Sequence, residues 1–123
     1  MTPNRPDPSS RDRLAAVARD LIAPVLVVSR EGVVEYVNQA CAAMLRQEPA
    51  WLLGRTFAEL VHPADRPRVK NELAAVVRNR PSGRFSQFRA RGHNRLSWQV
   101  LEGIFNNLLH DPDIAGVLVS CRE

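Results

Sequence analysis

Few residues of the types that most often carry out chemistry occur in this sequence. The two cysteines, Cys41 and Cys121, lie far apart and each stands in an apolar run. Free cysteines in such surroundings are usually buried and behave as small apolar residues, so we interpret both as core thiols. Nucleophilic catalysis would need a base within reach of the thiol, and no such base is indicated.

The histidines and close carboxylates give no stronger case for a reaction. His62, His93 and His110 form no His or Cys pair at the spacing of a metal site. The nearest carboxylate pair, Asp111 and Asp113, flanks a proline and is typical of a turn. No glycine-rich phosphate loop follows a strand. The sequence therefore predicts no catalytic residue and no metal site, and we expect a protein that is not an enzyme.

Length and composition indicate one folded domain. The chain has 123 residues, of which 45% are apolar and 24% charged, close to ordinary globular usage. Its longest apolar run, residues 21–28, is too short to cross a bilayer as a helix, which needs about 20 residues. The first residues lack the apolar segment of a secretory signal. We therefore expect a cytoplasmic protein with neither a membrane span nor a disulfide scaffold.

Positive charge is concentrated in one part of the chain. The net charge is +4, and the basic segment 66–95 holds Lys70 and many of the arginines. Clustered arginine could bind the phosphates of a nucleic acid. The aromatic residues of this segment, Phe85 and Phe88, are three positions apart in a predicted strand and so face opposite ways, which gives no stacking surface. Solvated charge is the favoured interpretation, and nucleic-acid binding the less favoured one.

The N-terminal part predicts a leader, a helix and a hairpin. Residues 1–8 contain three prolines and indicate a flexible leader. Residues 9–23 predict an amphipathic helix, because apolar residues recur at the spacing of one helical face: Leu14, Val17, Ala18, Leu21 and Ile22. Two β-branched runs, 25–29 and 33–37, are separated by a turn in which Gly32 can take positive φ. These runs predict a β-hairpin.

A helical region and three strands follow the hairpin. Asn38 can cap a helix over 39–46, residues 49–53 predict a short helix, and Thr56 with Glu59 has the spacing of a capping box. Asp65 can cap a longer helix that ends near residue 80. Strands are predicted over 84–91, 95–105 and 117–121, with a turn at 92–94. In the second of these strands the alternation of Leu96, Trp98 and Val100 with polar residues places those three on the buried face. The order indicates an α+β fold with one antiparallel sheet.

Several motifs in this order resemble the PAS domain, a sensory module found in many bacterial signalling proteins. The stretch 27–38 is similar to the family's opening hairpin, with Gly32 in the turn and Asn38 at the strand end. Residues 52–57 (LLGRTF) and 60–66 (LVHPADR) are similar to two stretches that follow in the family. Residues 111–117 resemble the loop before the last strand, and Arg122-Glu123 the start of a signal-passing Arg-Asp-x-Thr motif. The resemblance covers 24–123.

The resemblance implies a five-stranded antiparallel sheet with short helices and one longer helix on one face. It also implies a sensory or interaction module that binds a small ligand or a partner between the sheet and the helices. The candidate lining residues are Asn38, Met44, Phe57, Leu60, Leu73, Phe88, Trp98, Val119 and Ser120. For each apolar member of this set, plain core packing is the favoured alternative. The cofactor is left unknown. Haem is disfavoured because residues 66–80 contain no histidine, and covalent flavin because the photosensor motif is missing.

The resemblance further implies partners. PAS modules commonly dimerise through a flanking helix, so we expect a homodimer formed by the apolar face of the predicted helix 9–23. They also pass a signal through their termini to an effector such as a kinase, a cyclase or a DNA-binding domain that regulates transcription. A ligand-free homodimerisation scaffold is one alternative. A nucleic-acid-binding domain that uses the basic segment is another.

Overall fold

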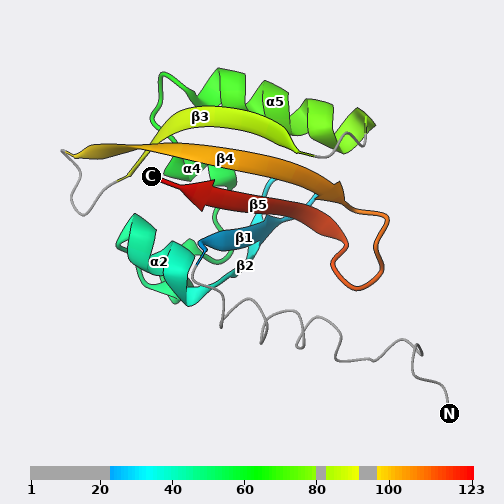
Figure 1. The fold of residues 1–123 in the computed structure, drawn as a ribbon, viewed down its shortest axis with the longest axis horizontal. Helices are drawn as coiled ribbons and strands as arrows, with labels where there is room; N and C mark the ends of the chain where they lie inside the picture. The colour runs from blue at the N-terminus through cyan, green and yellow to red at the C-terminus, as the bar shows by residue number, and fades with distance from the viewer. Residues whose placement is uncertain (1–22, 80–82, 92–96) are drawn as a thin grey trace, which may run out of the picture.

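The computed structural model describes residues 23–79, 83–91 and 97–123 and forms one antiparallel sheet with helices on one face (Figure 1). The predicted leader 1–8, the apolar positions of the predicted helix 9–23 and the turn 92–94 lie outside the described residues. The elements in chain order are β1 (Val25–Val28), β2 (Val34–Val37), α2 (Gln39–Leu45), α3 (Pro49–Leu52), α4 (Phe57–Leu60), α5 (Arg66–Asn79), β3 (Arg84–Arg91), β4 (Trp98–Leu108) and β5 (Gly116–Arg122).

The five strands lie in the order β2-β1-β5-β4-β3, and all neighbouring pairs are antiparallel. The predicted α+β class and the PAS-like arrangement of the sheet are therefore confirmed. Because β5 lies between β1 and β4, the first and last strands of the sequence are neighbours. Their ends are also tied together, since the Cys121 N–H donates to the Pro24 carbonyl at 3.0 Å.

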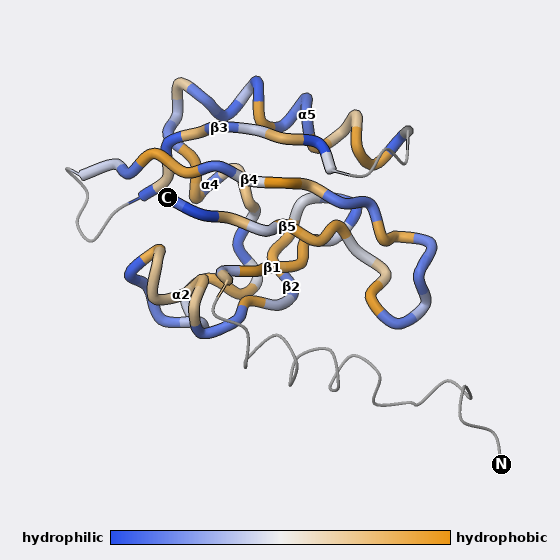
Figure 2. Tube along the Cα trace, viewed as in Figure 1, coloured by the Kyte–Doolittle hydropathy of each residue, from blue (hydrophilic) through white to orange (hydrophobic). Residues whose placement is uncertain are grey.

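The core lies between the sheet and the helices. Leu26 of β1, Val119 of β5 and Phe105 of β4 stand opposite one another in register, and all three are almost fully buried. α5 packs against β3 and β4, while α2 and α3 lie by β1 and β2. Figure 2 shows the apolar colouring concentrated along β1, β2 and the middle strands, where these layers meet. None of the helices in the described part of the chain is long and apolar enough to cross a membrane.

Local sequence signals account for the turns and helix starts. Gly32 closes the β1–β2 hairpin at φ +87, a conformation that residues with a side chain rarely adopt. The Asn38 side chain caps α2 by accepting the Cys41 N–H. Thr56 and Glu59 form the predicted capping box at the start of α4. These predictions are confirmed.

The buried side predicted for the fourth strand is wrong. β4 continues three residues beyond the predicted end, to Leu108, and its buried side is formed by Leu101, Gly103, Phe105 and Asn107. Trp98 and Val100 therefore lie on the other side of the sheet, where Val100 is 52% exposed. The prediction failed because both sides of β4 carry apolar residues, so a short stretch at one end does not identify the buried side.

Candidate functional site

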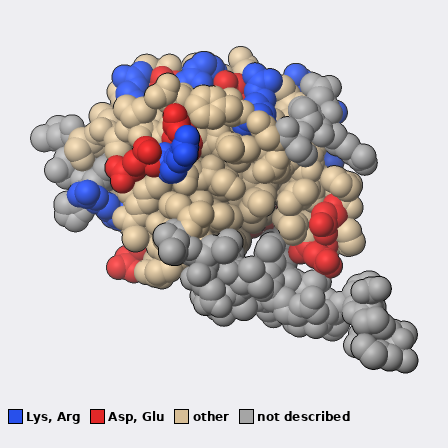
Figure 3. Space-filling view, viewed as in Figure 1, with Lys and Arg blue, Asp and Glu red and all other residues tan. Residues whose placement is uncertain are grey.

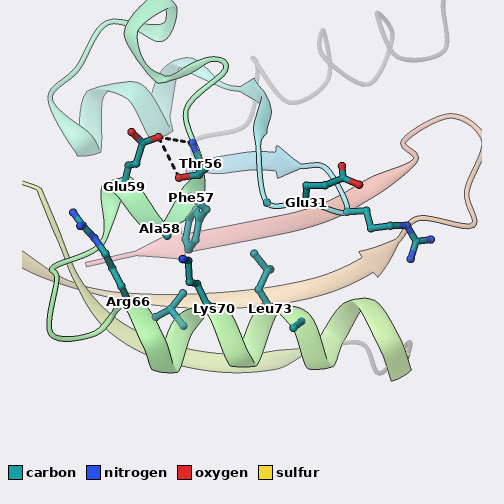
Figure 4. A pocket seen from close by; sticks show the side chains of 12 residues that line it. Glu31, Thr56, Phe57, Ala58, Glu59, Arg66, Lys70 and Leu73 are labelled. Carbon is teal, nitrogen blue, oxygen red and sulfur yellow. Dashed lines mark hydrogen bonds between the residues drawn. The ribbon is translucent and has the colours of Figure 1, made fainter.

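A cleft of about 430 Å³ lies between the β1–β2 hairpin turn, α4 and α5. This volume is in the range of pockets that hold small organic ligands. Figure 4 shows α5 along one side of the cleft and α4 with the hairpin on the other. The residues that line it are Arg30, Glu31, Gly32, Thr56, Phe57, Ala58, Glu59, Arg66, Val69, Lys70, Leu73 and Ala74. Three segments that are far apart in the sequence therefore build one site.

The floor of the cleft is apolar and continuous with the core. Phe57, Val69 and Leu73 line it, and each is at least nine-tenths buried. The Phe57 ring meets the rings of Phe88 and Phe105 edge to face, with centroids 5.5 and 5.9 Å apart. Such ring pairs are favourable and fix the ring orientation. Phe57 thus contacts the cleft on one side and strands β3 and β4 on the other.

The rim of the cleft carries both signs of charge. Arg66 and Lys70 stand one turn apart on α5, and Figure 4 shows both side chains extending from α5 toward α4. Glu59 lies on the α4 side, where its Oε2 accepts hydrogen bonds from the backbone N–H and the hydroxyl of Thr56, at 2.8 and 3.1 Å. These bonds, the backbone bond first, lower the pKa of Glu59 and keep it ionised.

The predicted lining residues do not all gather at this cleft. Phe57 and Leu73 line it. Leu60, Phe88 and Val119 are buried in the core, and Met44 is partly buried against that core. These four fill the space between the sheet and the helices with side chains. Their role as ligand contacts stays a prediction.

Trp98 and Ser120 lie on the opposite side of the sheet. Ser120 alternates with the buried Val119 and stands opposite Ile104, which is 42% exposed on the outer side of β4. Trp98 shares that side with Val100, and its ring lies 4.5 Å from the ring of His62. Neighbouring residues of a strand face opposite ways, so Ser120 and Val119 do not line one pocket.

Asn38 is occupied by structural hydrogen bonds. It is 1% exposed, and its Oδ1 accepts the N–H groups of Val25 and Cys41 at 3.0 and 2.9 Å. Its Nδ2 donates to the Ala23 carbonyl at 2.9 Å. The side chain thus joins the start of β1 to the start of α2. It holds these two backbone segments together and is not among the residues that line the cleft.

Asp65 has a different role from the predicted helix cap. Its carboxylate accepts the Arg89 backbone N–H at 2.9 Å and pairs with the Arg89 guanidinium at 3.0 Å. These bonds lower the pKa of Asp65 to about 2. The ion pair fastens the start of α5 to the edge strand β3, and the charge of Arg89 is neutralised within the domain.

Arg68 of the basic segment is also bound by residues of the same domain. Arg68 pairs with Glu72 at 3.1 Å and donates to the Gln87 carbonyl at 2.7 Å. Figure 3 shows that acidic side chains stand among the basic ones along the upper edge, over α5 and β3. Two basic side chains of this segment, those of Arg68 and Arg89, are therefore engaged by the protein itself.

The thiols are buried and neutral. Burial raises the pKa of Cys41 well above its usual range and raises the pKa of Cys121 to about 12. The thiolate is the nucleophilic form, so neither thiol is activated in this fold. In the described part of the chain, no group of three or more His, Cys, Asp or Glu side chains could hold a metal ion. His62 Nδ1 accepts the Ala64 N–H at 3.0 Å, and so stabilises the turn before α5.

Sequence reasoning missed the charged members of the cleft. Arg30, Arg66 and Lys70 all line it, but none was among the candidate lining residues. The signal that could have found Arg66 and Lys70 is their i,i+4 spacing beside the apolar face of α5. Arg30 could not have been found this way, because only the fold brings the hairpin turn to α5.

The sheet order, the short helices before α5 and the cleft beside α5 define a PAS-type α+β domain, and the sequence comparison agrees. Residues 19–123 match the family described as the PAS fold. The chain belongs to the PAS family.

Solved structures show the same fold at low sequence identity. The PAS domain of a protein from Colwellia psychrerythraea has a TM-score of 0.74 and 16% identity over 90% of this chain and 94% of that chain. A domain of the sensory box sensor histidine kinase/response regulator from Geobacter sulfurreducens has a TM-score of 0.72 and 18% identity over 91% and 92%. The PAS domain of the RpfR quorum-sensing receptor from Cronobacter turicensis, in complex with BDSF, has a TM-score of 0.64 and 12% identity over 83% and 92%.

Proposed function

We propose that this chain is a signal-sensing PAS module that binds a small ligand in the cleft beside α5 and passes the signal through its termini to an effector. The observation that carries the proposal is the position of Phe57, which forms part of the cleft and also contacts β3 and β4. A ligand that moves this ring changes the packing of the sheet. Similar domains from a sensor histidine kinase and from a quorum-sensing receptor support a sensory role and a kinase as the class of effector.

Few side-chain and strand contacts separate the cleft from the last strand. Phe105 of β4 stands opposite Val119 of β5, and β5 ends at Arg122. β5 also pairs with β1, so the strand nearest the N-terminus follows any shift of β5. Differential binding of the ligand to two packings of the sheet is what would carry the signal.

The test is whether the purified chain retains or takes up a small molecule in this cleft. Native mass spectrometry and an absorption spectrum would detect a ligand that copurifies. Ala74 lines the cleft, so Ala74→Phe fills it, whereas Ala43→Phe places the same side chain at an exposed position of α2. We expect the ligand to be lost only with Ala74→Phe. Equal retention in both variants, with both folded, would contradict the proposal.

We also propose that the protein forms a homodimer through the apolar face of the predicted helix 9–23. The specific observation that favours a dimer is the outer side of the sheet, where Phe85, Val100 and Ile104 are 54%, 52% and 42% exposed. Phe85 and Ile104 stand opposite each other on β3 and β4, and Val100 lies further along β4 on the same side. Exposed apolar side chains on one face often mark an interaction surface. A monomeric mass from light scattering at high micromolar concentration would overturn the proposed dimer. A dimer without any bound ligand would instead favour the ligand-free scaffold.

Nucleic-acid binding is the less favoured function. Arg68 and Arg89 of the basic segment are engaged by acidic side chains of the domain. Phe85 is exposed but Phe88 is 3% exposed, so these two rings form no stacking surface. DNA or RNA binding by the isolated chain that weakens steeply with salt would reverse this preference.

A further inference from the structure

The basic side chains of the cleft are better placed to bind an anion than its acidic side chains are to bind a cation. The Arg66 Nε donates to the Val61 carbonyl at 2.9 Å, which holds the guanidinium at the rim. The same side chain makes no other hydrogen bond and no ion pair within the described residues. Lys70 is exposed one turn further along α5, and no hydrogen bond or ion pair among the described residues engages it. Two cationic groups are therefore available at one rim.

The carboxylates at the rim offset only part of this charge, because Glu59 attracts Arg66 without forming an ion pair with it. Glu59 Oε2 is bonded to Thr56, and Glu59 Oε1 lies 3.9 Å from Arg55, which is not among the residues that line the cleft. Figure 4 shows the carboxylate of Glu31 directed away from α5. With Arg30 included, three cationic side chains line the cleft against two carboxylates. The side of the cleft formed by α5 is thus positive.

The apolar part of the cleft begins next to these cations. Val69 lies beside Lys70 on α5, and Leu73 follows about one turn later. Together with Phe57 they offer an apolar wall more than nine-tenths buried. A ligand that satisfies both parts has one anionic group and an apolar body, because a bare anion would leave the wall unused and a neutral apolar molecule would leave the cations unpaired.

We propose that the cleft selects amphipathic organic anions, with the anionic group held by Arg66 and Lys70 and the apolar body against Phe57, Val69 and Leu73. This inference rests on the proposed ligand-binding function and names the class of ligand. The negative group forms charge-assisted hydrogen bonds with the two basic side chains. The apolar body is bound by removal of its surface from water.

The test is a titration of the purified chain, followed by amide chemical shifts, with four probes. Octanoate carries the proposed chemistry, 1-octanol keeps the chain without the charge, octyltrimethylammonium inverts the charge, and inorganic phosphate has the charge without the chain. We expect octanoate to bind most tightly and to shift amides of α4 and α5. Equal or tighter binding of 1-octanol, octyltrimethylammonium or phosphate would overturn the proposal.

Matched variants locate the anionic group. Lys70→Gln and Arg66→Gln each remove one cation from the rim, and Arg78→Gln removes an exposed cation from the same helix outside the cleft. Loss of one charged hydrogen-bond donor should weaken octanoate binding roughly tenfold. Arg78→Gln should leave the affinity unchanged. Equal effects of Lys70→Gln and Arg78→Gln, or no effect of either rim variant, would contradict the proposal.

Failure of this inference can be told apart from failure of the proposed function. If octanoate does not bind, while a copurified molecule is lost in Ala74→Phe, the class of ligand is wrong and the ligand-binding function stands. If neither octanoate nor any copurified molecule occupies the cleft of the folded protein, both proposals fail. Thermal unfolding of each variant shows whether it is folded, and Lys70→Gln changes an exposed side chain that the fold does not need.

Discussion

Substitution of Asn38 by alanine should destabilise this domain strongly. With backbone groups in the described part of the chain, the side chain makes three hydrogen bonds, from a position that is 1% exposed. Two of them satisfy the backbone N–H groups of Val25 and Cys41, and the third engages the Ala23 carbonyl. Alanine removes all three hydrogen bonds at once and leaves at least the buried Val25 N–H without its acceptor.

The size of the effect follows from these contacts. Loss of an N-cap side chain costs about 1 kcal/mol, and an unsatisfied buried polar group costs about 1–3 kcal/mol. We therefore expect Asn38→Ala to lower the free energy of unfolding by about 3 kcal/mol. Domains of this size are stable by roughly 5–15 kcal/mol, so the variant should still fold. The melting temperature should fall by roughly 10–20 °C.

Urea unfolding followed by tryptophan fluorescence measures this change, with the slope against urea as a check on two-state behaviour. Asn38→Ser is the control, because serine is a favoured N-cap residue and keeps an acceptor for the Cys41 N–H. Its cost should be smaller than that of alanine. If alanine costs less than about 1 kcal/mol at an unchanged slope, or if serine costs as much as alanine, the hydrogen bonds of Asn38 do not stabilise the fold to this extent.

Two further changes test the packing around the site. The pKa of Asp65 is lowered from 3.8 to about 2, so the Arg89 pair stabilises the fold above about pH 4 and is lost as the pH falls toward 2. Asp65→Asn should lower the free energy of unfolding by about 1 kcal/mol at neutral pH. Between pH 4 and 2 the urea midpoint of this variant should fall less than that of the unsubstituted protein. An equal fall in both proteins would contradict this expectation. Gly103→Ala brings a Cβ to 3.1 Å from the Phe88 ring and should cost about 1 kcal/mol or more, measured by thermal unfolding. Val100→Ala, at an exposed position, is the control and should stay within about 0.5 kcal/mol.

The features that the sequence predicted well depend on residues close together in the chain. Asn38 caps a helix that begins at the next residue, and Thr56 meets Glu59 only three positions later. Gly32 closes a hairpin between adjacent strands. In each case the residue type and the spacing determine the local geometry, because the partners are held near one another whatever the rest of the fold does.

The features that the sequence predicted poorly depend on contacts between distant segments. The buried side of β4 is decided by what packs on it, and Val100 is as apolar as many core residues although it faces outward. The cleft joins a hairpin turn to two helices, so no single stretch of sequence marks it. Asp65 has the spacing of a helix cap, but Arg89 competes for its carboxylate from a strand 24 positions away. A charged partner brought by the fold outweighs the local signal.

The free energy available from a ligand bound in the cleft and the free energy of the aromatic contacts below it are of the same order. An edge-to-face ring pair is worth about 0.5–1.5 kcal/mol, and Phe57 takes part in two such pairs. A ligand present at 100 times its dissociation constant stabilises the state it binds by about 2.7 kcal/mol. A ligand that prefers a different orientation of Phe57 therefore has enough free energy to break one ring pair. Because Phe88 and Phe105 belong to adjacent strands, loss of either pair alters one strand relative to the other. We therefore expect Phe57 to be the residue whose packing responds first when the cleft is filled.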